Sequence, residues 1–236
     1  MSNRPFVSVL TPTYNRRRFI PALIECFKHQ KYPQSLMEWI ILDDGTDKVK
    51  DIFDASGLKN VRYYSEDIKL NIGAKRNKLN ELVKGDIVVC MDDDDYYPPE
   101  RVSHVVDQMR LNPKYEICGS SELYMFYSDN KTIYKLGPYH NNHATNGTMA
   151  YKPSYFVTHK YDETVTFAEE TSFLNKYTEP ILQLDPFKVM LVMSHSENTF
   201  DKKKLREQNN PMFKLTFMKL KNFIRNKALR DFFNDA

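Results

Sequence analysis

The stretch GDIVVCMDDDDYYPPERV, residues 85–102, decides the fold. Its apolar part, residues 86–91, is the most uniformly apolar run of the chain, which predicts a strand inside a sheet. Four aspartates, residues 92–95, stand where this strand ends. Because crowded carboxylates repel one another and raise each other's pKa, they need an exposed turn or a compensating cation. The cluster is therefore either a surface turn or a metal site, and the two prolines after it suit the first turn of a helix over Pro99–Met109.

Strands and helices alternate through the first half of the chain. We predict strands over Phe6–Thr11, within EWIILDDG (residues 38–45) and at VRYY (residues 61–64). Apolar residues at helical spacing follow in RRRFIPALIECFKHQ (residues 16–30) and in IGAKRNKLNELVKG (residues 72–85), where Gly85 is expected to cap the helix. This alternation specifies an α/β fold with a mostly parallel sheet covered by helices on both faces.

The chain changes character after residue 115. Residues 116–136 predict strands joined by the turn SDNK, and residues 139–148 read as a polar loop. A smaller, mixed half over residues 116–200 could therefore form the second wall of a cleft, opposite the α/β half over residues 1–115.

The last segment, residues 201–236, is expected to be an appendage. From Pro211 on, apolar residues fall on one stripe and most basic residues elsewhere, which predicts a basic amphipathic helix; the stripe is Phe213, Phe217, Leu220 and Ile224. Packing of this helix across the domain is the favoured interpretation, and a contact with a membrane surface or a second copy is the alternative.

Composition limits the possible classes of protein. The chain has 236 residues and a formal charge of +3, and no basic run is interleaved with aromatic residues, so nucleic acid is not expected as a partner. Its three cysteines are widely spaced in apolar contexts, which favours buried, reduced thiols. The N-terminus turns polar too early for a signal peptide, and no apolar run approaches the about 20 residues that span a bilayer. We expect a cytoplasmic protein, with a peripheral membrane contact as a possibility.

Three polar loops follow predicted strands. They are TPTYN (residues 11–15), DDGTD (residues 43–47) and MDDDDYY (residues 91–97). In an open α/β sheet the ligand binds beyond the carboxyl ends of the strands, so loops that meet at this edge predict a functional site.

Each loop has a chemical interpretation. Asp92 and Asp94, spaced as D-x-D, offer the sparse carboxylate ligation that Mg²⁺ or Mn²⁺ takes beside phosphate oxygens. Lys75 and Arg76 would supply positive charge to the same phosphates, or they lie on a solvated helix face. Asp43 or Asp44 could accept a hydrogen bond from a base, and the ring of Tyr14 could stack on that base.

Five ordered blocks together resemble family 2 glycosyltransferases of the GT-A fold. The blocks are SVLTPTYNR, WIILDDGTD, NIGAKRNK, GDIVVCMDDDDYYPPERV and FAEETSFLNKY, over roughly Phe6 to His195. The resemblance implies transfer of a sugar from a nucleotide diphosphate, commonly UDP, to an acceptor hydroxyl, with inversion at the anomeric carbon and with Mn²⁺ or Mg²⁺. Residues 1–200 would be the catalytic domain, with residues 1–115 binding the nucleotide and residues 116–200 the acceptor.

On the donor side, the resemblance assigns a role to each of the first two loops. Thr11, Pro12 and Tyr14 would line the nucleotide. Asp44 would contact the base, and Asp43 would orient the loop.

The resemblance also assigns roles within the aspartate cluster. Asp94 would be the main metal ligand, and Asp92 would serve the ribose or the metal. Because four aspartates leave the register open by one residue, Asp93 could take the ribose role instead. His195, after the apolar run FKVMLVM, would complete the metal shell, although a lone histidine after a strand is more often structural.

The expected catalytic base belongs to an acidic pair before a helix. The pair reads Glu169-Glu170 here, where the family pattern usually ends in aspartate. Glu170 would accept the proton of the acceptor hydroxyl, with Glu169 as the reserve candidate. We expect the helix dipole to keep Glu170 ionised.

Other functions remain open on sequence alone. A nucleotidyltransferase that makes nucleotide sugars would need a glycine-rich phosphate loop where TPTYNRRR stands. A phosphatase is not expected, because it would need a nucleophilic aspartate after the first strand, where the chain has TPTYN. A catalytically inactive relative that binds a glycan or a protein partner is the third alternative. Neither the donor sugar nor the acceptor, whether glycan, protein or lipid-linked, follows from the sequence.

Overall fold

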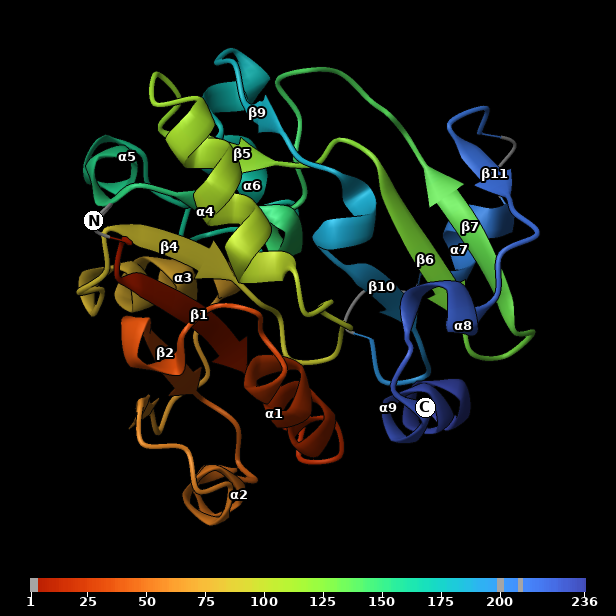
Figure 1. The fold of residues 1–236 in the computed structure, drawn as a ribbon, viewed down its shortest axis with the longest axis horizontal. Helices are drawn as coiled ribbons and strands as arrows, with labels where there is room; N and C mark the ends of the chain where they lie inside the picture. Colours follow the sequence, from red (N-terminus) through yellow and green to blue (C-terminus); the bar gives the residue numbers. More distant parts are fainter. Residues whose placement is uncertain (1–3, 199–201, 208–209) are drawn as a thin grey trace.

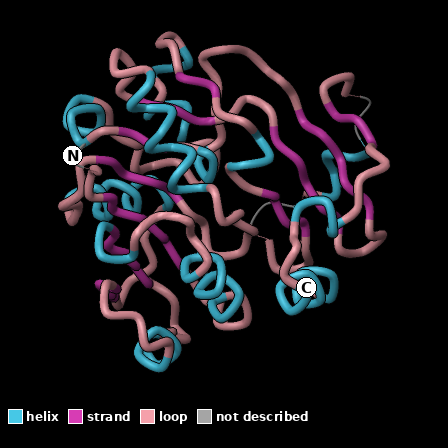
Figure 2. Tube along the Cα trace, viewed as in Figure 1, coloured by secondary structure: helices cyan, strands magenta, loops and turns pink. Residues whose placement is uncertain are grey.

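The computed structural model describes residues 4–198, 202–207 and 210–236 (Figures 1 and 2). A seven-stranded main sheet occupies one side of the molecule, in the order β3 (Val61–Ser65), β2 (Met37–Asp43), β1 (Val7–Thr13), β4 (Ile87–Cys90), β8 (Ala150–Tyr151), β5 (Ile117–Gly119) and β9 (Leu182–Gln183). Strands β3, β2, β1 and β4 are parallel, whereas β8 runs antiparallel to both of its neighbours. The predicted mostly parallel sheet is confirmed, and the apolar strand of the opening stretch, β4, lies inside it.

Helices cover both faces of the main sheet. They are α1 (Ile20–Lys28), α2 (Lys50–Ala55) and α4 (Arg101–Leu111) on one face, and α3 (Ile72–Glu81), α5 (Pro153–Thr158) and α6 (Glu170–Phe173) on the other. Because side chains alternate along a strand, Val9 of β1 belongs to the core beneath α1 and α4, whereas Leu10 belongs to the core beneath α3 and α6. All three cysteines are buried as free thiols, as predicted.

Two helix boundaries differ from the prediction. Helix α4 begins at Arg101, after both prolines rather than at Pro99. Helix α3 ends at Glu81, and Gly85 is not its cap. Instead the chain at Gly85 passes so close to β1 that a Cβ there would lie 2.6 Å from the Ser8 backbone nitrogen, which explains the glycine.

A second, four-stranded sheet stands beside the main sheet (Figure 1). Its order is β10 (Leu191–Ser194), β6 (Leu123–Tyr127), β7 (Thr132–Leu136) and β11 (Phe213–Leu215). The predicted turn SDNK joins β6 to β7 as an antiparallel hairpin. Short 3-10 turns complete the structure at Gln34–Leu36, Asn146–Thr148, Asn175–Tyr177 and Pro186–Lys188.

The single helix predicted from Pro211 on is wrong. The segment forms the edge strand β11, then α8 (Leu220–Phe223) and α9 (Lys227–Asp235), and α7 (Lys203–Glu207) precedes it. Backbone pairing of β11 with β7 outweighs the helical spacing of the apolar residues. Leu220 and Ile224 are buried, as the predicted packing across the domain requires, but Phe217 is fully exposed. Among the described residues, no helix combines the length and the apolar character needed to cross a bilayer.

Gly73 provides a test of how closely α3 packs. A Cβ at this position would overlap the carbonyl oxygen of Asp162. We expect Gly73→Ala to lower the free energy of unfolding by about 1–3 kcal/mol, because the backbone contact must open to admit the methyl group. Chemical denaturation would measure the change, with Glu81→Ala, an exposed position on the same helix, as the control. Equal stability of the two variants would contradict this packing.

Candidate active site

The polar loops lie together at the carboxyl edge of the main sheet. In the loop after β1, the Asn15 side-chain oxygen accepts hydrogen bonds from the Thr46 hydroxyl (3.3 Å) and the Asp47 N–H (3.0 Å) of the loop after β2. Gly45 lies so close that a Cβ there would stand 2.7 Å from the Asn15 nitrogen. The third loop, residues 91–97, follows β4, the other neighbour of β1. The three loops therefore share one edge, as the sequence predicts.

Two cavities meet at this edge. The loop-side cavity, of about 340 Å³, is lined by Pro12, Thr13, Tyr14, Arg16, Lys69, Leu70, Asn71, Ile72, Lys75, Arg76, Asp92, Asp93, Asp94, Asp95, Thr166 and Lys202. The sheet-side cavity, of about 510 Å³, lies against the second sheet, and its lining includes Leu123, Met125, Leu136, Gly147, Glu169, Glu170, Met190 and Val192. Both are lined by Ile72, Arg76, Asp92, Asp94, Asp95, Thr166 and Lys202. The aspartate cluster thus separates two spaces that could each hold part of a reacting pair.

The first and the last of the four aspartates contact parts of the protein that differ from those contacted by the middle two. One Asp92 carboxylate oxygen lies 3.0 Å from the Arg76 guanidinium. Asp95 accepts a hydrogen bond from the Met193 N–H (2.8 Å) and so fastens β10 to the end of β4. Asp92 thus ties the end of β4 to α3, and Asp95 ties it to the second sheet.

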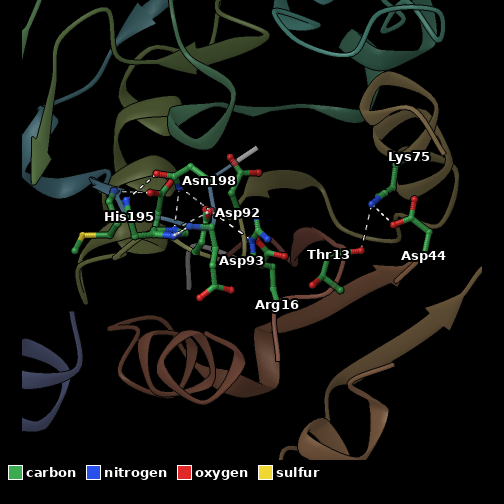
Figure 3. Close-up of polar contacts among 12 residues, drawn as sticks. Thr13, Arg16, Asp44, Lys75, Asp92, Asp93, His195 and Asn198 are labelled. Carbon is green, nitrogen blue, oxygen red and sulfur yellow. Dashed lines mark hydrogen bonds and ion pairs between the residues drawn. The ribbon is translucent and has the colours of Figure 1, made fainter. Parts of the chain in front are cut away.

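Asp93 and Asp94 face the loop-side cavity beside Arg16. The Arg16 Nε lies 3.9 Å from Asp93 and 3.7 Å from Asp94. The Asp94 Oδ2 also lies 3.2 Å from His195 Nε2 and 3.2 Å from the Asn198 side-chain nitrogen. Figure 3 shows His195 and Asn198 gathered at the cluster, with Arg16 beside it.

Burial and mutual repulsion separate the pKa values within the cluster. Burial, with the charge of Asp94, raises the pKa of Asp93 to about 8, and burial raises the pKa of Asp95 to about 7. Burial also opposes the charge of Asp94, but the hydrogen bond from His195 and the charge of Lys202 outweigh it and hold the pKa of Asp94 below its usual range. Of these three aspartates, Asp94 is the one whose pKa is lowered, so it is the one that its surroundings favour as an anion.

The divalent metal that the resemblance implies fits Asp94 and His195. Their carboxylate oxygen and imidazole nitrogen converge to 3.2 Å, and both atom types are ligands of Mn²⁺. Asp92, which we expected as a further ligand, points instead to Arg76. Within residues 4–198, 202–207 and 210–236, no three His, Cys, Asp or Glu side chains are grouped as a metal site. A metal here would have few protein ligands and would need oxygen atoms from elsewhere, as Mg²⁺ sites commonly do.

Arg76 joins the two halves of the site. It is buried, and its guanidinium lies 3.0 Å from Asp92 at the end of β4 and 2.9 Å from Glu169 before α6. Burial opposes its charge, but the two carboxylates outweigh burial, so the pKa of Arg76 lies well above its usual value. The expectation that Arg76 serves phosphates is therefore not matched, because its charge is already balanced.

Lys75 and Asp44 form a second buried ion pair. One oxygen of Asp44 contacts the Lys75 ammonium, and the other accepts a hydrogen bond from the Leu70 N–H (2.7 Å). The Asp44 side chain is 0% exposed and does not line the loop-side cavity. Because it is buried behind the cavity wall, the carboxylate does not reach the space in which a base would lie. Figure 3 shows this pair on the far side of Thr13 from the aspartate cluster.

Two other predicted residues stand behind the cavity wall. Asp43 accepts a hydrogen bond from the Gly45 N–H (2.8 Å), a contact that suits its expected role in orienting the loop. Thr11 is fully buried and donates to the Met91 carbonyl (2.7 Å), so it does not line the cavity as we expected. Thr13 does, because the cavity begins where β1 ends.

Glu170 is the first residue of α6 and lines the sheet-side cavity. Burial, and then the charge of Glu169, raises the pKa of Glu170 to about 7. The expectation that the helix dipole keeps Glu170 ionised is wrong, because α6 has only four residues and burial dominates. A carboxyl group that titrates near neutral pH is suited to proton transfer.

Sequence reasoning missed several cavity residues. Arg16 directly follows the loop TPTYN, so its position alone could have indicated it. Asn198 lies three residues after His195, and its side-chain nitrogen is 2.9 Å from His195 Nε2. The Lys69 ammonium lies 4.2 Å from the centroid of the Tyr14 ring, and Lys202 comes from the segment assigned to the appendage. Nothing in the local sequence marks these two lysines.

The family assignment rests on a match over most of the described fold. The family described as glycosyl transferase family 2 matches residues 8–176, which include both sides of the Arg76 bridge. The chain belongs to glycosyl transferase family 2. Curated proteins similar to this chain include the putative colanic acid biosynthesis glycosyl transferase WcaA of Escherichia coli, 31% identical over 44% of this chain, and the putative teichuronic acid biosynthesis glycosyltransferase TuaG of Bacillus subtilis, 32% identical over 45%. These matches span 37% and 42% of the relatives' own lengths.

Solved structures share the fold of this family 2 chain. The mannosyltransferase PcManGT of Pyrobaculum calidifontis, in complex with GDP-Man and Mn²⁺, has a TM-score of 0.66 at 16% identity, over 84% of this chain and 59% of that one. S. aureus TarS 1-349, in complex with UDP-GlcNAc, has a TM-score of 0.64 at 18% identity, over 81% and 59%. The expected GT-A architecture is thus confirmed.

Removal of Arg76 would test the bridge across the site. Arg76→Met leaves the buried carboxylates of Asp92 and Glu169 without their cation, and such a loss typically costs about 3–5 kcal/mol of stability. We expect thermal and chemical unfolding to show this loss, and neutralisation of both acids, in Arg76→Met/Asp92→Asn/Glu169→Gln, to restore part of it. Lys78→Met, on an exposed position of α3, is the control. A triple variant no more stable than the single one would argue against the ion pairs as the cause.

Proposed function

We propose that this protein transfers a sugar from a nucleotide diphosphate sugar, with UDP as the favoured nucleotide, to an acceptor hydroxyl with inversion at the anomeric carbon. The observation that carries the proposal is the meeting of the two cavities at Asp94, which His195 contacts from behind, with Glu170 lining the second cavity. The family supports the reaction class, and the neighbours TarS and PcManGT, whose structures hold UDP-GlcNAc and GDP-Man, support a nucleotide-sugar donor. We take residues 1–200 as the catalytic domain.

The donor would occupy the loop-side cavity. Pro12, Thr13 and Tyr14 form the wall on which the nucleoside would lie, and the ring of Tyr14 offers it an aromatic face. Arg16 and Lys202 then provide positive charge near the diphosphate, in the role that we had expected of Lys75 and Arg76.

Asp94 and His195 would hold a divalent metal next to the diphosphate. When bound, such an ion neutralises the negative charge that develops on the leaving group. Asn198 contacts both side chains and so fixes their orientation. Asp94 lines both cavities, and His195 contacts it from the protein interior.

The acceptor would enter the sheet-side cavity with its hydroxyl toward Glu170. Its oxygen forms the new bond to the anomeric carbon while the bond from that carbon to the diphosphate oxygen breaks, and Glu170 takes the hydroxyl proton. The nucleotide diphosphate leaves with the bonding electron pair, so atoms and charge balance. Attack from the face opposite the leaving group gives inversion.

Metal-dependent nucleotide binding is the first test of this proposal. Titration calorimetry of UDP and GDP, each with and without Mn²⁺, should show binding that depends on the metal. Asp94→Asn should weaken the binding in Mn²⁺ at least about tenfold, since a site with two protein ligands loses its only charged one. Asp107→Asn, an exposed position on α4, should bind as the unaltered protein does. If the nucleotide affinity is the same with and without Mn²⁺, and the same in Asp94→Asn as in the unaltered protein, the metal assignment is overturned.

Glu170→Gln tests the catalytic base. The amide cannot accept the proton, so we expect turnover to fall by about 10²–10⁴, with nucleotide affinity unchanged. Burial and the charge of Glu169 raise the pKa of Glu170 to about 7, and the charge of Arg76 opposes this shift. Because the base must be ionised to accept a proton, turnover of the unaltered protein should rise with pH through about 7. Transfer to a panel of acceptors, with Glu81→Gln as control, would measure both. Near-normal turnover in Glu170→Gln would exclude it as the base.

A further inference from the structure

Positive charge is concentrated at the C-terminal end of the chain. Residues 202–236 contain ten Lys and Arg against three Asp and Glu, although the whole chain carries only +3. The remainder of the protein is therefore net negative. Four of the ten lie on or just before α7 and the other six on or beside β11, α8 and α9, and Figure 1 shows these elements at the side of the molecule formed by the second sheet.

Two large apolar side chains project into solvent among these charges. Phe217, between β11 and α8, is 103% exposed, and Leu215, the last residue of β11, is 60% exposed. The lysines at positions 214 and 219, on either side of them, are also exposed. A fully exposed aromatic ring close to a second exposed apolar residue is a candidate contact point for another surface, because clustered exposed apolar side chains often mark interaction sites.

A basic cavity of about 380 Å³ lies next to this loop. Lys131, Lys219, Lys221 and Arg230 line it, and its acidic lining residue, Asp231, is paired with Lys227. Among the described residues, no carboxylate lies within 4.0 Å of the ammonium groups of Lys219 and Lys221, whose charges remain available to an anion. The cavity is of a size that admits a phosphate-bearing group.

One face of the second sheet leads from the sheet-side cavity toward the same loop. Leu123 and Met125 of β6 line the cavity. Leu123 pairs with Leu136 of β7, which pairs in turn with Phe213 of β11. In the same way Met125 pairs with Tyr134, which pairs with Leu215. Paired residues of antiparallel strands share a face. An apolar strip therefore continues from the cavity wall to the exposed side chain of Leu215.

We propose that this region, the basic edge formed by Lys131, Leu215, Phe217, Lys219, Lys221 and Arg230, docks on the surface of an anionic phospholipid membrane. Head-group phosphates would enter the cavity between the four cations. Phe217 and Leu215 would enter the boundary between head groups and acyl chains, where exposed apolar side chains flanked by lysines bind. A soluble polyanion would use the cations alone and would give Phe217 no place out of water, so a bilayer is the occupant that accounts for both features.

Vesicle co-sedimentation tests the proposal without any nucleotide or acceptor, so its outcome is independent of the proposed transfer reaction. The full chain should sediment with vesicles of phosphatidylcholine and phosphatidylglycerol, but not with phosphatidylcholine alone. Phe217→Ala should weaken binding at least about tenfold, because the variant loses the free energy gained when the aromatic side chain moves from water into the bilayer. Lys219→Ala/Lys221→Ala should weaken it by about fivefold per lysine.

The controls separate the basic edge from the rest of the surface. Leu111→Ala/Lys114→Ala removes an exposed apolar side chain and an exposed lysine at the end of α4, and should leave vesicle binding unchanged. Thermal unfolding would show that all variants are folded. The proposal is overturned if anionic vesicles do not bind, or if Phe217→Ala binds them normally. It is also overturned if light scattering shows a dimer that Phe217→Ala abolishes, since a second copy would then be the occupant.

Discussion

The site depends on the ion pairs of one buried arginine. Arg76 comes from α3 in the first half of the chain, and it holds Asp92 at the end of β4 and Glu169 just before α6. Three charges can be buried together only because each is paired, since a lone buried ion costs several kcal/mol. The same ion pairs also affect the pKa of the neighbouring Glu170. Glu169 raises the pKa of Glu170, and Arg76 limits the rise, so a structural bridge also tunes the proposed base.

The four aspartates at the end of β4 persist because they do not act as one cluster. Asp92 and Asp95 are held by protein donors, and the pKa of Asp93 is raised far enough that it need not carry a charge at neutral pH. This leaves Asp94 as the anion supported by His195 and Asn198. The repulsion that the sequence alone would suggest is thus reduced because, in the turn that follows β4, Asp92, Asp94 and Asp95 contact different protein groups.

Periodicity and loop placement predicted the main sheet and the edge where the loops meet, because both follow from local pattern. They could not predict which way a charged side chain turns. Lys75 and Arg76 look like phosphate ligands in sequence, but α3 packs against the sheet and buries both. Thr11 lies too far inside β1 to reach the cavity, because this strand continues to Thr13, and only the structure shows where the strand ends. The sequence pattern predicts a helix where the strand Phe213–Leu215 forms. Its partner strand, β7, lies about 80 residues earlier in the chain, and a pairing over such a distance leaves no signal in the local sequence.

The second sheet joins the C-terminal segment to the wall of the sheet-side cavity. On β6, Leu123 and Met125 face the sheet-side cavity, while the intervening Tyr124 packs against Phe187 and Phe223 of the covering segments. One face of the sheet therefore shapes the proposed acceptor space, and the other is sealed by the residues that carry the basic edge. Because a single layer of strands separates the two, attachment at the edge would fix the orientation of the acceptor cavity relative to the surface bound. An acceptor displayed at that surface would then approach Glu170 along the sheet rather than from bulk solvent.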